Sequence, residues 1–259
     1  MLNLSDRQAQ IADLVREQGF VTVDELSERF EVTTQTIRRD LNVLCDQGVA
    51  RRRHGGIESL VDSGNLTYGS RQILQRPAKQ AIAREVAQHV PPGASIAFSI
   101  GTTPEVVAQS LLRHERLRVF TNNLNIAMLA CANPEFEVNI VGGRLRNSDR
   151  DILGSGMDAF FSSYVFDIGI YGVAGVGDDG TLLDFTEEEV RARRLIHQNS
   201  RQTFLVLDHT KFGRTAHVRG GHIREASKVF CDARPPDAIV RALSASGTEL
   251  IICRGEQQQ

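Results

Sequence analysis

The run VTTQTIRRDL at residues 32–41 has the pattern of a capped helix. This predicted helix decides the fold of the N-terminal part of the chain. Thr33 is a residue type that caps helices, and apolar side chains recur at helical spacing at Ile37, Leu41 and Leu44. The pattern predicts a helix that begins after Thr33 and buries one face. The arginines of the run fall on the opposite, solvent-facing side.

Shorter segments on both sides of this helix complete a small domain. Apolar spacing predicts one helix from Ser5 to Gly19 and a second over residues 23–30, joined by a short extended piece. Residues 49–57 predict two extended arms around a Gly-Gly turn. Helix, helix, turn, helix and hairpin is the order of a winged helix-turn-helix, in which the helix after the turn enters the major groove of DNA.

Charge is distributed unevenly over this region. Residues 1–32 contain three Arg and seven Asp or Glu, whereas residues 33–57 contain five Arg and two Asp. The whole chain has 30 Lys and Arg against 32 Asp and Glu, so any nucleic-acid site has to be local. An alternative to DNA binding is that these arginines form a solvated charged face on a module that binds another protein. The predicted DNA contacts are Thr34, Gln35, Thr36, Arg38 and Arg39 on the third helix, and Arg51, Arg52, Arg53 and His54 on the hairpin.

The composition of the chain excludes several classes of protein. With 259 residues, of which 41% are hydrophobic and 24% charged, it is typical of one or two globular domains and not of a disordered or disulfide-stapled chain. The four cysteines are far apart and form no C-x-x-C pair, so we expect no metal site, and no cofactor is predicted. The N-terminus lacks the features of a secretion signal, which predicts a cytoplasmic protein.

The rest of the chain predicts a second domain of a different type. Residues 58–76 have no clear period and predict a linker between a DNA-binding domain at residues 1–57 and an α/β domain at residues 77–255. In the second domain extended apolar runs alternate with helical ones, which favours a mostly parallel sheet covered by helices. The predicted strands are 95–100, 117–121, 138–141, 165–171, 203–207, 229–231 and 250–252, and the predicted helices are 77–89, 104–113, 125–132, 187–198 and 236–245.

A glycine and two threonines follow the first predicted strand of this domain. Gly101 permits a close approach of the backbone, and Pro104 is suited to the start of a helix, for which Thr103 is the predicted N-cap. Free N–H groups at a helix start, together with the hydroxyls of Thr102 and Thr103, suit a phosphate dianion. The loop therefore predicts a site for a sugar or polyol phosphate.

Polar residues after other strands extend this site. Because the carboxyl ends of parallel strands meet at one edge of a sheet, loops that follow different strands converge there. Cations in these loops are candidate partners for the phosphate, and a carboxylate is a candidate acceptor for sugar hydroxyls. One carboxylate, Glu189, also completes a T-x-x-E capping box with Thr186. The residues of these loops that carry such groups are Thr121, Asn122, Arg146, Glu189 and Lys211.

Two sets of motifs resemble the DeoR family of bacterial transcriptional regulators. The run TIRRDL at residues 36–41, followed by RHGG at residues 53–56, is similar to the family's DNA-binding signature. The order GTT, TN, GGRLR, EVR and DHTKFG in the second domain is similar to its effector domain. This resemblance implies that the phosphate is held by Gly101, Thr102, Thr103, Thr121, Asn122, Gly143 and Arg146, with Glu189, Asp208 and Lys211 near the polyol end. The resemblance implies a repressor that leaves operator DNA when a phosphorylated inducer binds, with a second domain similar in fold to ribose-5-phosphate isomerase.

Finer features of the resemblance concern the inducer and the assembly. The runs IGTTPE at residues 100–105, TNNLN at 121–125 and LLDF at 182–185 are most similar to regulators of glycerol-3-phosphate metabolism, which implies glycerol-3-phosphate as inducer. Two winged helices are needed to read a palindromic operator, so we expect a homo-oligomer, either a dimer or a tetramer.

Other functions are compatible with the same sequence. The effector domain resembles isomerases and deaminases as well as sensors, so Asp167, Glu189, His209 and Lys211 are also candidate acids and bases. A nicotinamide-sensing domain would need a G-x-G-x-x-G loop after the first strand, where this chain has Gly101 followed by two threonines. A regulator of the same family that senses another sugar phosphate is the remaining alternative.

Overall fold

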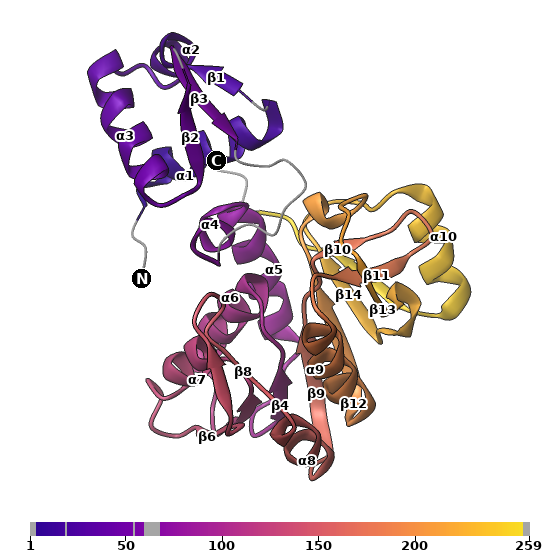
Figure 1. Ribbon diagram of the computed structural model, residues 1–259. Coiled ribbons are helices and arrows are strands. Elements are labelled where there is room, and N and C mark those ends of the chain that lie inside the picture. The colour runs from indigo at the N-terminus through magenta and orange to yellow at the C-terminus, as the bar shows by residue number, and fades with distance from the viewer. Residues whose placement is uncertain (1–3, 19, 54, 60–67, 256–259) are drawn as a thin grey trace. The chain divides into compact units, whose positions relative to one another are not determined.

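A computed structural model describes residues 4–18, 20–53, 55–59 and 68–255 of the chain. The chain divides into two compact units, Met1–Arg76 and Pro77–Gln259, each with its own hydrophobic core (Figure 1). No helix among the described residues is long and apolar enough to cross a membrane.

The N-terminal unit has the predicted winged helix-turn-helix order. Its helices are α1 (Asp6–Gln18), α2 (Val23–Arg29), α3 (Thr34–Asp46) and α4 (Tyr68–Ile73). Its strands are β1 (Phe20–Thr22), β2 (Ala50–Arg53) and β3 (Gly56–Ser59), which form an antiparallel sheet in the order β1-β3-β2. The predicted cap of the third helix is confirmed, because the Thr33 hydroxyl accepts a hydrogen bond from the Thr36 N–H at 3.2 Å.

The hydrophobic core of the N-terminal unit includes residues that follow the β2–β3 hairpin in the sequence. Leu26, Ile37 and Leu44 are fully buried beneath the three main helices. Ile73 and Leu74 join the same cluster, although they lie in the segment predicted as a linker. The compact unit therefore extends to Arg76 and includes α4, whereas residues 60–67 of the predicted linker lie outside the described residues.

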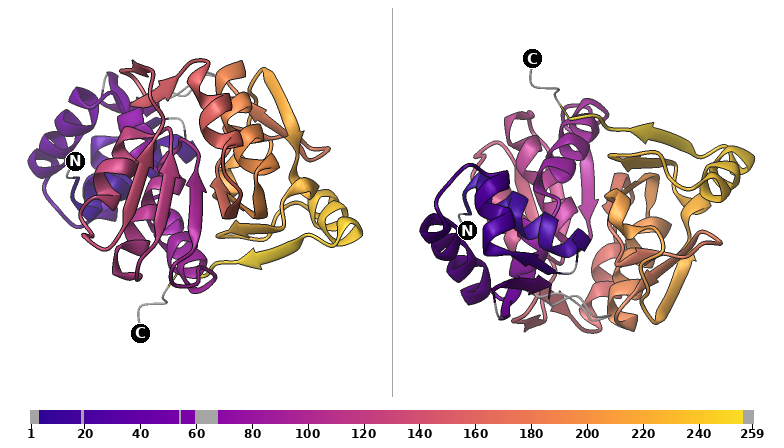
Figure 2. Two further views of the ribbon diagram at one scale, coloured as in Figure 1. Left: turned by 90° about the horizontal axis from the view of Figure 1, so that it is seen from below. Right: turned by 90° about the horizontal axis from the view of Figure 1, so that it is seen from above.

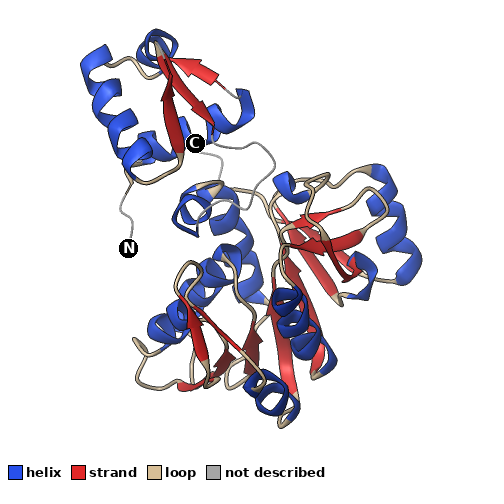
Figure 3. Ribbon diagram, in the orientation of Figure 1, coloured by secondary structure: helices blue, strands red, loops and turns tan. Residues whose placement is uncertain are grey.

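The C-terminal unit is built on the predicted parallel sheet. Seven strands lie in the order β15-β14-β12-β9-β4-β5-β6, and every neighbouring pair is parallel (Figure 3). Each predicted strand corresponds to one of them. Their bounds are β4 (Ser95–Phe98), β5 (Arg118–Thr121), β6 (Glu137–Ile140), β9 (Phe166–Tyr171), β12 (Ser200–Val206), β14 (Lys228–Cys231) and β15 (Glu249–Ile252).

Helices cover both faces of this sheet (Figures 2 and 3). Successive strand residues point to opposite faces, so Phe98 packs in the core beneath one helix layer and Ala97 in the core beneath the other. The first layer is α5 (Arg76–Gln88), α6 (Thr102–Ser110) and α7 (Leu124–Ala130), and the second is α8 (Gly156–Ser162), α9 (Glu187–Gln198) and α10 (Asp237–Ser246).

Several short elements were not predicted. Their strands have two to five residues, and their pairing partners are set by long-range packing that a local pattern does not report. They are helix α8, the hairpin of β7 (Arg144–Arg146) and β8 (Asp151–Leu153), the sheet of β10 (Gly175–Val176), β11 (Thr181–Asp184) and β13 (Val218–His222), and the 3-10 turns Leu111–Arg113, His209–Lys211 and Ile223–Glu225.

Candidate DNA-binding and effector sites

Helix α3 presents the predicted recognition residues to solvent. Its inner face buries Ile37, Leu41 and Leu44, while Gln35, Arg38 and Arg39 are exposed, and Thr34 and Thr36 are half-buried. Neither Arg38 nor Arg39 forms a side-chain hydrogen bond or ion pair with another described residue. Both guanidinium groups are therefore available for bidentate contacts with guanine or for contacts with phosphate.

Asp40 holds α3 in place and was not predicted as a site residue. Its carboxylate is buried and accepts hydrogen bonds from Arg7 Nε at 2.7 Å and from Gln8 Nε2 at 2.8 Å. These contacts connect the recognition helix to α1. The signal in the sequence is a carboxylate next to Ile37 and Leu41 on the apolar stripe, where an unpaired charge would be costly.

The hairpin arginines are engaged within the N-terminal unit. Arg51 and Arg53 both form ion pairs with Glu58, the latter at 2.9 Å, and Arg51 makes the larger contribution to keeping the pKa of Glu58 below its ordinary value. Arg52 donates to the Asn42 side chain and to the Arg38 carbonyl, at 3.3 Å for the carbonyl. Their exposed guanidinium groups thus start from a partly neutralised state. His54, the remaining predicted contact, lies outside the described residues.

The start of α6 is the best-formed part of the predicted effector site. Its N-cap is Gly101, with φ of 135°, and the helix begins at Thr102, so the prediction that Thr103 is the cap was wrong. The glycine conformation lets the helix start two residues earlier than predicted. The N–H groups of the first helical residues have no intrahelical acceptor, and Pro104 has no N–H. Neither the Thr102 nor the Thr103 hydroxyl bonds to another described residue.

The residues after β5 mainly support the local backbone. The Thr121 hydroxyl donates to the Phe98 carbonyl at 3.1 Å and accepts from the Asn123 N–H at 3.0 Å. The Asn122 amide donates to the Ile152 carbonyl at 3.3 Å, and Asn123 caps α7. These contacts connect neighbouring strands at the carboxyl edge of the sheet. Asn122 Oδ1 is buried without a partner among the described residues.

Arg146 lies at the centre of a carboxylate network. Its guanidinium bonds Asp151 at 2.8 and 2.9 Å and Glu189 at 3.0 Å, and lies 3.6 Å from Asp149. Burial alone would lower the pKa of Arg146, but these carboxylates, chiefly Asp151, raise it above its ordinary value. The network brings together two predicted residues, Arg146 and Glu189. Gly143 shapes the same hairpin, because a Cβ on it would lie 2.9 Å from the Leu153 carbonyl.

The remaining predicted residues follow β12 or begin α9. Glu189 forms the predicted capping box with Thr186, so both of its carboxylate oxygens are occupied. Asp208 is buried and accepts from the Thr210 N–H at 3.1 Å as the cap of the turn that ends at Lys211. In the sheet β12 is separated from β4 by β9 alone.

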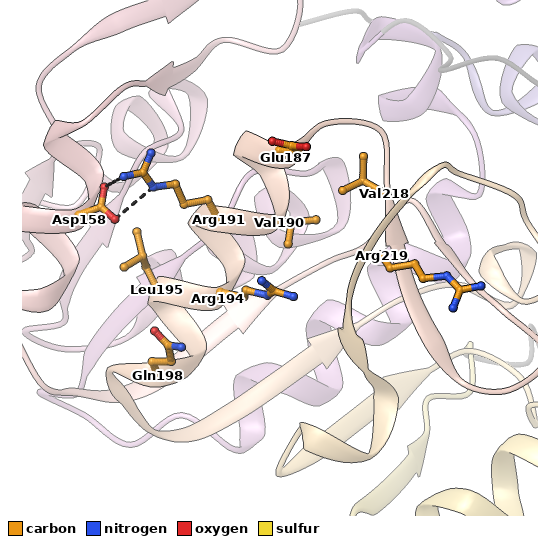
Figure 4. Close-up of a pocket in the computed structure, with 9 residues that line it drawn as sticks. All are labelled: Asp158, Glu187, Val190, Arg191, Arg194, Leu195, Gln198, Val218 and Arg219. Carbon is orange, nitrogen blue, oxygen red and sulfur yellow. Dashed lines mark hydrogen bonds and ion pairs between the residues drawn. The ribbon is translucent and has the colours of Figure 1, made fainter.

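Two cavities lie along α9, the helix that also carries the predicted residue Glu189. One has a volume of about 450 Å³ and is bounded by α8, α9 and β13 (Figure 4). The other, of about 300 Å³, shares Arg194 and Gln198 with the first and reaches Tyr171. None of the residues predicted to hold the effector lines either cavity. We therefore place the candidate effector site from strand topology and hydrogen bonding and not from cavity volume.

Comparison with known sequences and structures places the chain in a family. A model of the DeoR-like helix-turn-helix domain matches residues 7–62, and a model of the DeoR C-terminal sensor domain matches residues 74–233. The chain is 42% identical to the glycerol-3-phosphate regulon repressor of Escherichia coli (strain K12) over 249 residues, which cover 96% of this chain and 99% of that protein.

A second repressor and a solved structure also resemble the chain. The HTH-type transcriptional repressor CsqR of Escherichia coli (strain K12) is 36% identical over 246 residues, covering 95% of this chain and 94% of that protein. Among solved structures, ribose 5-phosphate isomerase A from Methanocaldococcus jannaschii matches 52% of this chain and 54% of that one, with a TM-score of 0.39 and 16% identity. The chain belongs to the DeoR family of transcriptional regulators.

Proposed function

We propose that this protein is a transcriptional repressor that leaves its operator when glycerol-3-phosphate binds to the C-terminal unit. Two relatives that match almost the full chain are transcriptional repressors, and the chain is accordingly a regulator and not an enzyme. The proposal rests mainly on the exposed guanidinium groups of Arg38 and Arg39 on a recognition helix, which bond to no other described residue. The chain is also 42% identical to glycerol-3-phosphate regulon repressors. This role places the protein in the cytoplasm, where its operator is.

Operator recognition combines two kinds of contact. Residues at the N-terminal end of α3, namely Gln35, Arg38 and Arg39, read base edges in the major groove. Arg51, Arg52 and Arg53 on the hairpin hold phosphates or the minor groove. Because two of the hairpin arginines already pair with Glu58, the arginines of α3 contribute more to sequence preference.

Inducer recognition uses the carboxyl edge of the sheet. The free N–H groups at the start of α6 and the hydroxyls of Thr102 and Thr103 bind the phosphate, with Lys211 as the cation. Arg146 is engaged by Asp151 and Glu189, so its role is to fix the hairpin and the start of α9. Thr121, Asn122 and Gly143 shape the loops around the ligand, and Asp208 positions the turn that carries Lys211.

The repressor acts as a homodimer or a larger assembly, because a palindromic operator presents two half-sites. The inducer shifts the equilibrium by binding more tightly to the arrangement that does not fit the operator. A typical coupling of about 1–3 kcal/mol lowers operator affinity about 5- to 150-fold.

Replacing Arg38 by alanine is expected to weaken operator binding by about 1–3 kcal/mol and to relax the preference at one base position, because the variant loses a bidentate base contact. The measurement is fluorescence anisotropy with a duplex selected by the wild-type protein from a random pool, at fixed salt. Arg241→Ala, which removes an exposed arginine of α10, is the matched control. Affinity equal to that of the wild type would contradict the assignment of α3 as the recognition helix.

Replacing Thr102 or Lys211 by alanine is expected to leave operator binding unchanged but to weaken glycerol-3-phosphate binding by about 1.5–3 kcal/mol, because each change removes a hydrogen bond to a charged group. Calorimetric titration measures the affinity, and release of the labelled operator duplex measures the response. The control is Thr215→Ala, at an exposed threonine in the loop after Lys211. Wild-type inducer affinity in both variants would show that the phosphate binds elsewhere.

A further inference from the structure

The outer face of α9 carries an exposed stripe of charged and polar side chains. Glu187, Arg191, Arg194 and Gln198 are all exposed and recur at intervals of three and four residues, so they lie on one face of the helix. Acidic residues occupy the N-terminal end of the stripe, and Arg191 and Arg194 occupy its middle and C-terminal part. The face is therefore polarised along its length.

Two of the three charged residues of the stripe have no partner among the described residues, and the third is neutralised. Neither Glu187 nor Arg194 forms an ion pair or hydrogen bond with another described residue. Between them, Arg191 bonds both carboxylate oxygens of Asp158 on α8, one of them at 3.1 Å (Figure 4). One copy of the helix thus offers an unsatisfied negative charge and an unsatisfied positive charge about two turns apart.

This arrangement is complementary to itself. When two copies of α9 pack antiparallel around a two-fold axis between residues 190 and 191, Glu187 of each copy lies opposite Arg194 of the other. The exposed side chain nearest the axis is then Arg191, because Val190 is buried against Gly220 of β13. Two copies of Arg191 would repel each other there, but Asp158 already neutralises each one. A shift of the axis to a position between Arg191 and Arg194 would instead place these two arginines opposite each other.

The surface beside the stripe has room for a partner. The cavity of about 450 Å³ follows the stripe, with Asp158 on one side and Val218 and Arg219 of β13 on the other (Figure 4). Val190 and Leu195 line its floor but are almost fully buried, so the surface open to a partner is mainly charged and polar. Ion pairs in such a space become stronger once a partner excludes water.

We infer that α9 forms an antiparallel two-fold contact with α9 of a second copy of this chain, in which Glu187 of each copy pairs with Arg194 of the other. The inference rests on the proposed binding of a two-fold operator, which calls for a dimer, and it specifies the surface through which the C-terminal units meet. Because the contact is isologous, each ion pair occurs twice.

Sedimentation equilibrium of the full chain tests this contact through a charge exchange. Arg194→Glu and Glu187→Arg, each alone, place like charges opposite each other at two symmetric positions, and we expect the dimer dissociation constant to rise at least about tenfold. The variant that combines both changes restores opposite charges and is expected to return to within about threefold of the wild-type constant. Arg241→Glu, on exposed α10, is the control and leaves the constant unchanged.

Other outcomes would overturn the inference. A monomeric wild-type protein, or an Arg194→Glu variant that dimerises as tightly as the wild type, would show that α9 is not the contact. Single variants that dissociate without recovery in the combined variant would refute the pairing of Glu187 with Arg194. Operator binding is measured on the same samples: a dimeric Arg194→Glu protein that still binds the operator leaves the repressor function standing, whereas a wild-type protein that binds no operator contradicts that function.

Discussion

Asp184→Ala is expected to destabilise the C-terminal unit by about 3–5 kcal/mol, because it leaves the guanidinium of Arg193 buried without its counter-charge. In the folded protein Arg193 Nη2 lies 2.7 Å from Asp184 Oδ2, and the two side chains are only 5% and 8% exposed. Burial raises the pKa of Asp184, and the nearby Arg193 offsets part of that rise.

This ion pair connects four elements of the C-terminal unit. Asp184 ends β11 and also accepts from the Ala174 N–H at 3.1 Å in the loop after β9. Arg193 belongs to α9, donates to the Gly220 carbonyl of β13 and lies over the ring of Tyr171, 5.9 Å from its centroid. Loss of the carboxylate therefore weakens the packing of α9 and the small sheet together.

Hydrogen exchange and urea denaturation of the full chain measure this effect. Exchange should accelerate in peptides from residues 77–255 and stay unchanged in peptides from residues 4–59. Asp158→Ala is the matched control, since it breaks another arginine–aspartate pair whose side chains are 52% and 42% exposed, and we expect a loss below about 1 kcal/mol. Equal effects of the two changes would contradict a structural role for the buried pair.

The substitution Gly56→Ala is expected to cause a large loss of stability in the N-terminal unit. A Cβ at this position would lie 2.3 Å from the Val21 carbonyl oxygen and 2.9 Å from the Thr22 Cα. The obstructing atoms belong to the backbone of β1, which pairs with β3 at this point, so no side-chain rotation relieves the overlap. We expect a destabilisation of about 3 kcal/mol and displacement of the hairpin from β1.

The neighbouring glycine provides the control for this change. Gly55 has φ of 80°, a conformation that asparagine tolerates, and a Cβ added to it would meet no described atom within 4 Å. Gly55→Asn is therefore expected to cost less than about 1 kcal/mol. Operator affinity should fall in Gly56→Ala while inducer affinity stays at the wild-type value. An unchanged operator affinity would show that the pairing of β1 with β3 is unnecessary for DNA binding.

The regular elements could be predicted from the sequence because their signals are local. The helical spacing of Ile37, Leu41 and Leu44 defined α3, and the apolar runs located all seven strands of the parallel sheet. The boundary of the first unit was less predictable. Ile73 and Leu74 lie in a segment where apolar residues do not recur at a clear helical or strand spacing. Only the folded core shows that these two residues belong to the N-terminal unit.

The candidate site residues remain a prediction, but their positions in the chain could be anticipated in part. Residue type and strand order were sufficient to place Thr102, Arg146 and Lys211 in the connections that follow β4, β6 and β12. The pairing of Arg146 with Asp151 and Glu189 could not be predicted, because it depends on how an unpredicted hairpin meets α9. Likewise, no local pattern shows that Asp40 bonds to α1 over more than thirty residues of sequence.

Calorimetric titration of the 259-residue chain with glycerol-3-phosphate shows whether this ligand is the inducer, with glycerol, ribose-5-phosphate and NADH as comparison ligands. We expect saturable binding of glycerol-3-phosphate, no binding of glycerol and weaker or no binding of ribose-5-phosphate, because the phosphate provides the main anchor and the polyol the selectivity. Tighter binding of ribose-5-phosphate would keep the repressor but contradict the proposed inducer. Binding of NADH alone, or continuous heat from turnover of a sugar phosphate, would contradict a glycerol-3-phosphate sensor altogether.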